Sequence, residues 1–219
     1  PTAATFEFSA DFESNDNTQG AVIPGWSFFG AGPGYGYGPF DLKNSFEQAG
    51  NIATGEGGAA QGTQYLNAFN DYTSPEHINS TGNPLTISVF RQFAIGADES
   101  GSYQFKVDAK LPSQFALASP ATGKIFVKRL DPLNDYAETI LGEVDAALIT
   151  DAEWQTFTIN FDVDSATEEG QLLQFGFSTT AKNGESSGVL YDNVSVAEYT
   201  PPTAATFEFS ADFESNDNT

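Results

Sequence analysis

The sequence predicts an all-β fold, either a β-sandwich or a barrel. Three features of the 219-residue chain support this prediction. Short stretches in which apolar and polar residues alternate recur along the chain, as in strands with one buried face. Turn-forming residues separate these stretches at short intervals. Only residues 138–152 have a pattern compatible with a short helix, and that pattern is weak. Many short strands with few helices are typical of sandwiches and barrels.

The expected strands follow one another along the chain. In the first, residues 5–12, Phe6 and Phe8 alternate with Glu7 and Ser9. The later ones have the same period of two, at 64–69, 85–93, 102–111, 124–130, 154–163, 172–178 and 188–196. Residues 26–40 are rich in glycine and aromatic residues, so we expect a loop or an irregular edge there. We expect a second glycine-rich connection at 51–62.

An exact repeat sets the domain organisation. Residues 1–18 recur letter for letter as residues 202–219, an offset of 202 − 1 = 201 residues. Identity at a fixed period is the signature of an array. We therefore interpret 1–198 as one sandwich unit and 199–203 as a proline-rich linker. Residues 204–219 are then the first strand of the next identical unit, or a strand donated to a neighbouring unit. A duplication introduced by cloning would leave the same letters.

Composition limits the partners and the chemistry. The chain has 30 acidic and 8 basic residues, a net charge of −22, which disfavours nucleic acid and anionic lipid surfaces. The charge serves solubility, or it holds divalent cations between carboxylates. The absence of cysteine excludes disulfides, thiolate zinc sites and cysteine nucleophiles. No apolar run is long enough to insert in a membrane. The composition is typical of an exported surface protein.

Catalysis finds little support in the sequence. The single histidine, His77, lies in a polar stretch without a nucleophile motif. No glycine-rich phosphate loop and no histidine-rich metal spacing is present. A carboxylate pair for glycoside hydrolysis stays open, since thirty acidic residues always offer pairs, but nothing singles one out. We expect that the chain is not an enzyme.

Five short motifs occur in an order that points to a family. They are Asp11-Phe12-Glu13, Pro24-Gly25-Trp26, Gly62-Thr63-Gln64-Tyr65-Leu66, Trp154 before a long alternating strand, and Tyr191-Asp192-Asn193-Val194-Ser195-Val196. Together they resemble the jelly-roll carbohydrate-binding modules found beside secreted xylanases and glucanases, within the galactose-binding-like sandwiches. The resemblance spans residues 6–196. It implies a two-sheet antiparallel jelly-roll β-sandwich, a structural calcium ion and, in some members, a sugar cleft on the concave face.

The resemblance also implies a set of metal ligands. The first and last strands of a jelly roll lie near each other, so Glu13 and Asp192 are the expected calcium ligands, with Asp11 as a weaker candidate. Calcium prefers six to eight oxygen ligands from carboxylates and carbonyls, which suits these residues. The alternative is that Glu13 is merely solvated and Asp192 caps a turn.

Aromatic side chains are the candidates for carbohydrate binding, because sugar rings stack on exposed aromatic faces. The candidates are Trp26, Tyr35, Tyr37 and Tyr72. If the Gly-Tyr-Gly-Tyr-Gly segment is extended, Tyr35 and Tyr37 lie on one side of it. The same patch would serve equally as a docking surface for a neighbouring unit.

Two hypotheses for the function follow. In the first, the chain is a non-catalytic, calcium-stabilised unit of an extracellular filament or long surface adhesin, and identical units assemble head to tail. If the units exchange strands, the inter-unit contacts are Phe207, Phe209, Phe213 and Glu214, in the place that residues 5–13 take in the first unit. The alternative is a carbohydrate-binding module of a secreted polysaccharide-degrading enzyme, with a polysaccharide as its partner.

Overall fold

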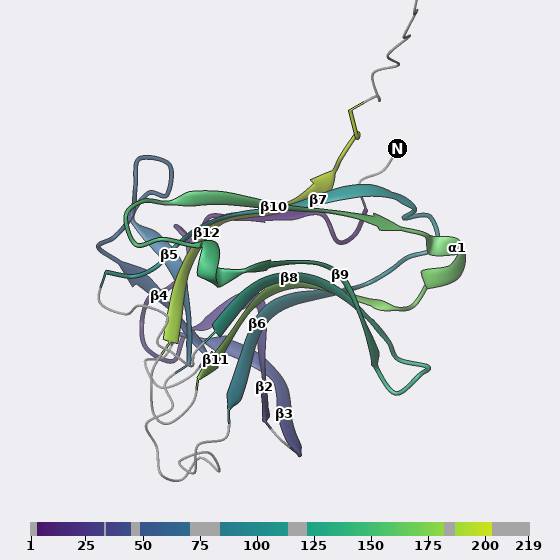
Figure 1. Cartoon of the computed structure of the whole chain (residues 1–219), viewed down its shortest axis with the longest axis horizontal. Helices are drawn as coiled ribbons and strands as arrows, with labels where there is room; N and C mark the ends of the chain where they lie inside the picture. The colour runs from purple at the N-terminus through teal and green to yellow at the C-terminus, as the bar shows by residue number, and fades with distance from the viewer. Residues whose placement is uncertain are drawn as a thin grey trace, which may run out of the picture.

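Two antiparallel sheets pack face to face in the computed structural model (Figure 1). The structure describes residues 4–32, 34–44, 49–70, 84–113, 122–181 and 187–202. The predictions for Tyr72, His77 and the second copy of the repeat beyond Pro202 lie outside these residues. Within them, most of the alternating stretches are strands, which confirms the all-β prediction.

The first sheet, sheet A, has six strands. In spatial order its path is β10 (Gln155–Val163), β7 (Gly101–Lys110), β12 (Ser187–Glu198), β5 (Gln64–Asn70) and β4 (Gly50–Thr54), and β1 (Phe8–Ala10) pairs with β12 off this path. The second sheet, sheet B, also has six strands. Their order is β3 (Tyr35–Lys43), β2 (Val22–Gly32), β6 (Leu85–Ala94), β11 (Leu172–Ala181), β8 (Thr122–Asp131) and β9 (Ala137–Asp145).

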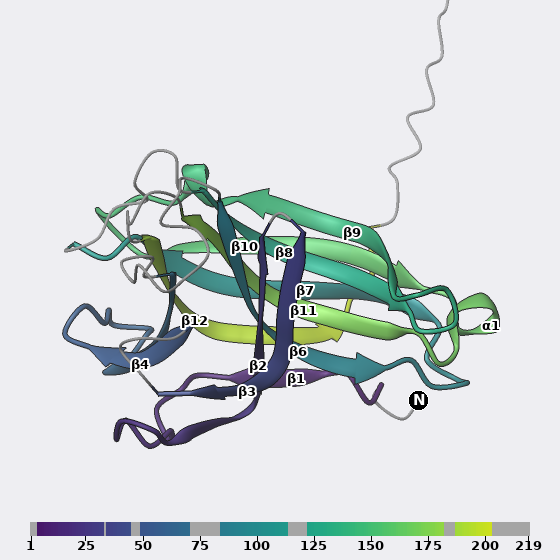
Figure 2. The same ribbon diagram turned by 90° about the horizontal axis from the view of Figure 1, so that it is seen from below.

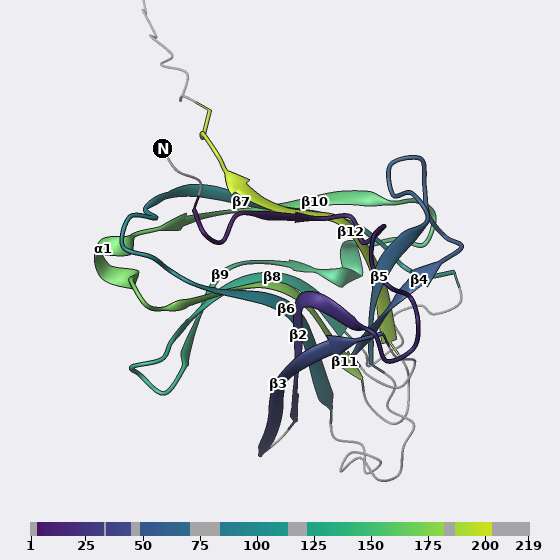
Figure 3. The same cartoon turned by 180° about the vertical axis from the view of Figure 1, so that it is seen from behind.

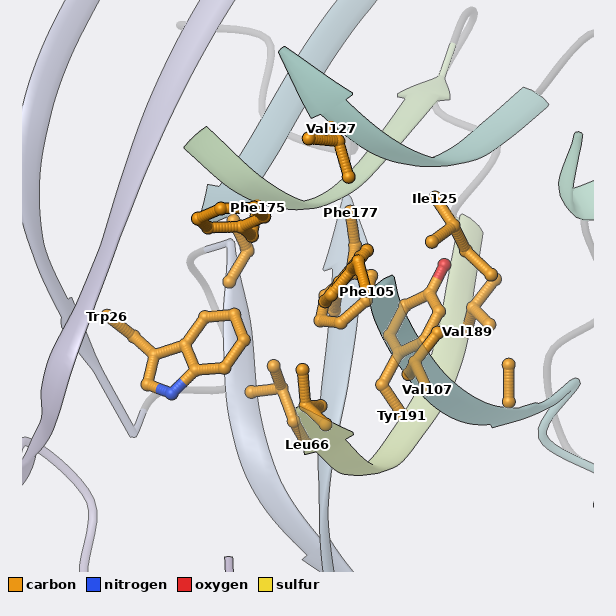
Figure 4. Close-up of a cluster of buried hydrophobic side chains, with 14 of the residues drawn as sticks. Trp26, Leu66, Phe105, Val107, Ile125, Val127, Phe175, Phe177, Val189 and Tyr191 are labelled. Carbon is orange, nitrogen blue, oxygen red and sulfur yellow. The ribbon is translucent and has the colours of Figure 1, made fainter. Parts of the chain in front are cut away.

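Alternating residues of both sheets form one aromatic core. On β11, Phe175 and Phe177 point toward sheet A and are fully buried. Phe105 of β7 meets them from the other sheet, with ring centroids 5.8 Å and 6.3 Å away. Tyr191 of β12 stacks on Phe177 at 3.6 Å (Figure 4). Burying one such side chain contributes about 1.5–3 kcal/mol, so the alternation seen in the sequence is also the main source of stability.

Of the two expectations for residues 26–40, the loop is wrong, because this segment lies in the β2–β3 hairpin. The irregular edge is confirmed, since β3 is the outer strand of sheet B and its pairing with β2 shifts register at two places. The glycines of this segment make room for aromatic rings instead of breaking the strands. A Cβ on Gly30 would lie 2.2 Å from Cζ of Tyr37, and a Cβ on Gly36 would lie 2.8 Å from Cζ of Phe29. At these two positions glycine leaves space for an aromatic ring of the paired strand, so it contributes to the packing of this sheet edge.

Two further expectations about secondary structure are wrong. Residues 138–152 do not form the expected helix as a whole: residues 138–145 belong to the edge strand β9, which pairs with β8 through a bulge, and within this range only Ala146–Leu148 form a short helical turn. A strand fits because Gly142 lies against Ile159, where a Cβ would be 2.3 Å from Cγ2. Residues 50–54, which overlap the expected connection at 51–62, form β4 by pairing with β5. The periodicity of these short segments was too weak to show either pairing.

The described residues contain only two short helical turns, η1 (Ala146–Leu148) and α1 (Ser165–Glu168). Neither has the length or the apolar character that a helix needs to cross a membrane.

The first copy of the repeat is an integral part of the sandwich. We refer to its residues 4–13 as the first-copy segment. Only Phe8–Ala10 pair with β12, so the strand expected at 5–12 is confirmed in its centre alone (Figure 2). Beyond the strand, Phe6 and Phe12 are 0% and 2% exposed, and Phe12 has a positive φ of 57°. The segment therefore enters the core at both ends of β1.

Candidate functional site

A distortion of β12 places Asp192 inside the protein. The pairing of β12 with β7 shifts register between Asp192 and Ser195, and Asn193 has a φ of 48°. Asp192 is 1% exposed. Its Oδ1 accepts a hydrogen bond from the Asn193 N–H at 2.7 Å. Its Oδ2 is buried and has no hydrogen-bond partner among the described residues. An unpaired carboxylate oxygen in such a place is costly, so a cation or a hydrogen-bond donor beside it would be stabilising.

The surroundings of Asp192 are acidic. Asp108 faces it across β7 and β12, but the oxygens of Asp108 already accept hydrogen bonds from Thr156, Gln61 and Asn193. Burial raises the pKa of Asp192 to about 7, and the charges of Asp11, Glu13 and Asp108 act in the same direction. The site therefore favours a positive charge beside Asp192.

Glu13 reaches this region from the end of the first-copy segment. Its carboxylate accepts hydrogen bonds from the Gln64 N–H at 2.7 Å and from the N–H and hydroxyl of Thr63 at 2.6 and 2.9 Å. These bonds lower the pKa of Glu13, with the bond from Gln64 contributing most. Gly62 has a φ of 57°, and a Cβ there would lie 2.4 Å from Glu13 Oε1. Residues 62–64 thus form a cradle for Glu13, and the alternative that Glu13 is merely solvated is wrong.

Asp11 completes the acidic region, because its Oδ1 accepts a hydrogen bond from the Glu13 N–H at 3.2 Å. Among the residues that the structure describes, no group of three or more histidine or acidic side chains is close enough to hold a metal ion. A cation here would also need main-chain or water oxygens. Calcium accepts such mixed oxygen ligands, and the buried Oδ2 of Asp192 is a suitable donor.

A cavity of about 690 Å³ adjoins this acidic region, between β1, the loop that follows it and β12 on one side and β2 and β6 on the other. Asp11 and Asn193 also line it. Apolar atoms of Val22, Pro24 and Trp26 form part of its wall. The rest of the wall is rich in hydrogen-bonding side chains, among them Ser9, Asn15, Asp16, Arg91, Asn193 and Ser195. A cavity that combines apolar walls with converging polar groups is the usual form of a small-molecule site.

Arg91 gives the cavity a fixed positive charge. Its Cζ lies 4.3 Å from the centroid of the Phe8 ring and 5.2 Å from that of Phe93. Its Nε is buried without a hydrogen-bond partner, and no described carboxylate forms an ion pair with it. Burial lowers the pKa of Arg91. The guanidinium is thus held in place by aromatic rings rather than by a counter-charge.

The two aromatic candidates whose side chains the structure describes, Trp26 and Tyr37, do not form an exposed platform. Trp26 is 3% exposed and stacks on Phe177 at 5.7 Å, so the prediction that its face is free for a sugar ring is wrong. Its position on β2 turns the ring into the core. Tyr37 is half-buried and packs against Phe28 and Phe40, each with centroids 6.5 Å away. Tyr35 is two residues away on the same strand, but its side chain lies outside the described part of the chain, as does Tyr72.

The outer face of sheet B is concave, because the sheet bends away from sheet A at both ends (Figure 1). Its two central aromatic side chains, Phe90 and Phe126, are only 2% and 4% exposed. Around them lie polar pairs, including the amides of Gln92 and Gln174 at 2.7 Å. This face offers hydrogen-bonding groups, but its central rings have little free surface for stacking.

Sequence reasoning missed Arg91, Asp108 and Asn193 as members of these sites. Arg91 lies on the inward face of its strand, opposite Phe175, which is an unusual position for an arginine. That departure from the alternation is the signal that the sequence contained. Asp108 and Asn193 carry no such signal, since only the pairing of β7 with β12 brings them together.

No known family model and no curated protein matches the sequence. Solved structures do match the fold. The apo form of a cyclase from Fischerella sp. superposes with a TM-score of 0.53 over 89% of this chain and 95% of its own, at 16% identity. The chain is a jelly-roll β-sandwich.

Carbohydrate-binding modules are also among the similar structures. The xylan-binding CBM22-1 domain of Paenibacillus barcinonensis Xyn10C has a TM-score of 0.45 and 14% identity, over 87% of this chain and 92% of that one. The family 11 module of Clostridium thermocellum Lic26A-Cel5E has a TM-score of 0.46 and 11% identity, over 90% and 98%.

Proposed function

We propose that the chain is a non-catalytic, exported module that binds polysaccharide in the cavity beside β1. The observation that carries the proposal is the cavity itself. Its 690 Å³ lies within the range of small-ligand sites, and its wall joins apolar surface to many hydroxyl, amide and charged groups. Sugars need such a combination, since their hydroxyls both donate and accept hydrogen bonds while their ring faces are apolar.

Arg91 is the proposed anchor of the sugar. Its guanidinium donates hydrogen bonds in fixed directions, and the rings of Phe8 and Phe93 hold it in position. Asn15 lies on the rim and is accessible to solvent, so it can bond a hydroxyl as donor or acceptor. Among solved structures of similar fold, one is described as binding xylan and another as a complex with β-1,4-galactotriose. These glycans are therefore the first ligands to test.

Affinity gel electrophoresis and calorimetry test the proposal with xylan, β-1,4-galactan and a mixed-linkage β-glucan. We expect one of them to retard the protein, and Arg91→Met and Asn15→Ala to weaken that binding at least tenfold, the loss of about one charge-assisted hydrogen bond. Asp151→Ala, on an exposed turn that does not line the cavity, is the matched control. Binding that is unaffected by both cavity variants would contradict the assignment, as would the absence of binding to any glycan.

A second candidate function is that of a structural unit in an extracellular filament or long adhesin, assembled head to tail. The observation that favours it is the exact repeat, whose first copy lies in the core of the sandwich. A comparison of native and denatured mass, after chelation of divalent ions, tests this candidate. A large native assembly, or a chain of many units, is expected. A native particle with the mass of one unit would speak against it.

We also propose that a calcium ion binds between Glu13 and Asp192, with Asp11 nearby. Two features support this proposal: the buried, unpaired Oδ2 of Asp192 and the acidic residues around it. The ion would supply the positive charge that these carboxylates lack and would join the first-copy segment to β12.

A further inference from the structure

We propose that residues 202–219 of one copy of this chain take the place of the first-copy segment in a second copy, adding β1 to the neighbour's sheet A. This proposal specifies the partner in the second candidate function, the head-to-tail assembly, and rests on it. The argument depends on what holds the first-copy segment in its place, which we refer to as the β1 slot.

The β1 slot is a pocket for three phenylalanine rings. The Phe6 ring lies 4.7 Å from that of Tyr103 and 6.2 Å from that of Phe175. Phe8 stacks on Phe93 at 5.6 Å, and Phe12 lies 5.6 Å from Trp26. All these contacts are made with residues of β2, β6, β7 and β11. Without the segment, these strands would expose a continuous apolar surface, which is the surface that an added strand covers.

Both ends of the slot are fixed by polar contacts. Glu99 accepts a hydrogen bond from the Thr5 N–H at 2.6 Å. Glu13 is bound by the cradle at residues 62–64. Between these anchors, Phe8, Ser9 and Ala10 pair with Val196, Ser195 and Val194. The anchors fix the register of the strand, so the slot selects one sequence rather than any apolar peptide.

The second copy has that sequence. Because residues 202–219 are identical to 1–18, every contact of the slot has a counterpart 201 positions later. Phe207, Phe209, Phe213 and Glu214 correspond to Phe6, Phe8, Phe12 and Glu13. The exchange thus replaces each contact by the same contact. The free energy of the slot contacts is therefore the same before and after the exchange. Because the slot holds one segment at a time, the first copy must leave it before the second copy of another chain can enter.

The connection after β12 directs the second copy outward. β1 runs antiparallel to β12, so the start of β1 lies toward the end of β12 (Figure 3). To enter its own slot, the chain would have to reverse direction within residues 200–205, between Tyr199, whose N–H bonds to Ser102 O, and Thr206, the counterpart of Thr5. Pro201 and Pro202 both lie at this point and are exposed. A residue before proline is held extended, and proline lacks the N–H that a hairpin needs. An extended exit favours the slot of another copy.

The exchange also builds the cavity from two chains. Ser9, Ala10, Asp11 and Phe12 of the first-copy segment line it, and after exchange Ser210, Ala211, Asp212 and Phe213 of the neighbour would do so. In the exchanged form, the proposed sugar site would therefore be built from residues of two chains, with the same side chains as in the single chain.

Three variants of the full chain test the proposal. Phe6→Asp with Phe12→Asp breaks the first copy and leaves the second intact. Phe207→Asp with Phe213→Asp is the matched control, which breaks only the second copy. The third variant combines all four changes and leaves the slot without any intact donor. We measure the Tm of each variant by calorimetry and its mass by light scattering.

The expected result is a first-copy variant with a Tm close to that of the wild type and a mass of several chains. The matched control should be a monomer of wild-type Tm, and the fourfold variant should lose most of its cooperative unfolding. A first-copy variant that unfolds like the fourfold variant would overturn the proposal. So would a monomeric first-copy variant of wild-type Tm, because its second copy would then fill its own slot.

A disulfide reports the donor directly, since the chain has no cysteine of its own. Ser9 faces Ser195 in the antiparallel pair, at a spacing compatible with a disulfide. In the first-copy variant, Ser210→Cys with Ser195→Cys should give a ladder of linked chains on a non-reducing gel. The control, Ser9→Cys with Ser195→Cys in the variant that breaks only the second copy, should give only an internal bond. A first-copy variant without the ladder would also overturn the proposal. The proposed sugar site is tested separately by the glycan-binding experiment, whose outcome does not depend on these variants.

Discussion

The two ends of the first-copy segment are held by the same chemistry in opposite arrangements. At the Thr5 end the sandwich supplies the carboxylate: Glu99 is 8% exposed and accepts the N–H groups of Thr5 and Gly96, each at 2.6 Å. At the Glu13 end the segment supplies it, and the sandwich offers the N–H groups of Thr63 and Gln64. Glu13 itself is exposed to solvent.

Because of this difference, we expect the Thr5 end to affect the stability of the fold in general and the Glu13 end to affect how that stability depends on ions. At the Thr5 end the Phe6 ring is fully buried although Thr5 itself is exposed, so the contribution of this end depends mainly on the fit of that ring. The Glu13 end lies beside Asp192 and its unpaired oxygen, where a bound cation would change the balance of charge. We therefore expect mutations at the first end to change stability under all conditions. Those at the second end should change how stability responds to ions.

The largest effect is expected at the Phe rings. In the background of Phe207→Asp with Phe213→Asp, where no intact second copy can replace the first, Phe6→Ala should lower the free energy of unfolding by about 3–5 kcal/mol. Phe12→Ala should cost as much or somewhat less, since Phe12 lies at the less enclosed end. Urea denaturation measures both. Equal stability of Phe6→Ala and its parent would show that the Thr5 end does not hold the segment.

Calcium should stabilise the Glu13 end. At one hundred times its dissociation constant, the ion would add about 2.7 kcal/mol and raise the Tm. Asp192→Ala should abolish this response, whereas Glu99→Gln, at the other end, should preserve it. Calorimetry with calcium and with chelator provides the comparison. An unchanged response in Asp192→Ala would remove this residue from the proposed site.

Gly62→Ala tests the cradle alone. The change adds strain at a φ of 57° and brings a Cβ to 2.4 Å from Glu13 Oε1, so we expect a loss of about 2 kcal/mol. Gly170→Ala is the control, because its φ is also positive, 81°, but a Cβ there would meet no atom within 4 Å. It should cost about 1 kcal/mol, the strain alone. Equal losses in both variants would show that the contact with Glu13 is unimportant.

The smallest effect is the dependence on pH. Burial tends to raise the pKa of Glu99, but the hydrogen bonds from Thr5 and Gly96 outweigh it and hold the pKa below the ordinary value of 4.5. The stabilisation is therefore fully present above that value and is lost as the pH falls below it. We expect the Tm of the wild type to fall more steeply on acidification than that of Glu99→Gln. Parallel curves would argue against a stabilising role for the Glu99 carboxylate.

Local patterns in the sequence determined most of the fold. The alternation around Phe105, Phe177 and Val194 predicted strands because burial of one sheet face imposes a period of two. The same reasoning missed the strands within 26–40, where it predicted only the irregular edge correctly, and the strand at 138–145. In the first case, glycines that looked like breakers make room for rings of the paired strand. In the second, an edge strand pairs on one side only and shows little alternation.

The candidate sites depended more on tertiary structure. The family resemblance brought Glu13, Asp11 and Asp192 into consideration. In the fold the charges of Asp11 and Glu13 act on Asp192, but the described acidic side chains do not form a group close enough to hold a metal ion by themselves. The resemblance gave no sign of Asp108, which reaches Asp192 only through the pairing of β7 with β12. Trp26 appeared suitable for sugar stacking, but the register of β2 turns its ring into the core. The residue types alone could not show which of these candidate side chains are buried and which are exposed, because that depends on which face of each sheet is covered.

The sequence by itself determined that the chain carries two identical copies of one strand-forming segment, since identity is visible without any structure. Only the tertiary structure decided what such a segment does. It fills the core with Phe6 and Phe12 and is fixed at both ends by residues 99 and 62–64. The reason is physical: an isolated strand has no stability of its own, and its role follows from the surface that distant parts of the chain present to it.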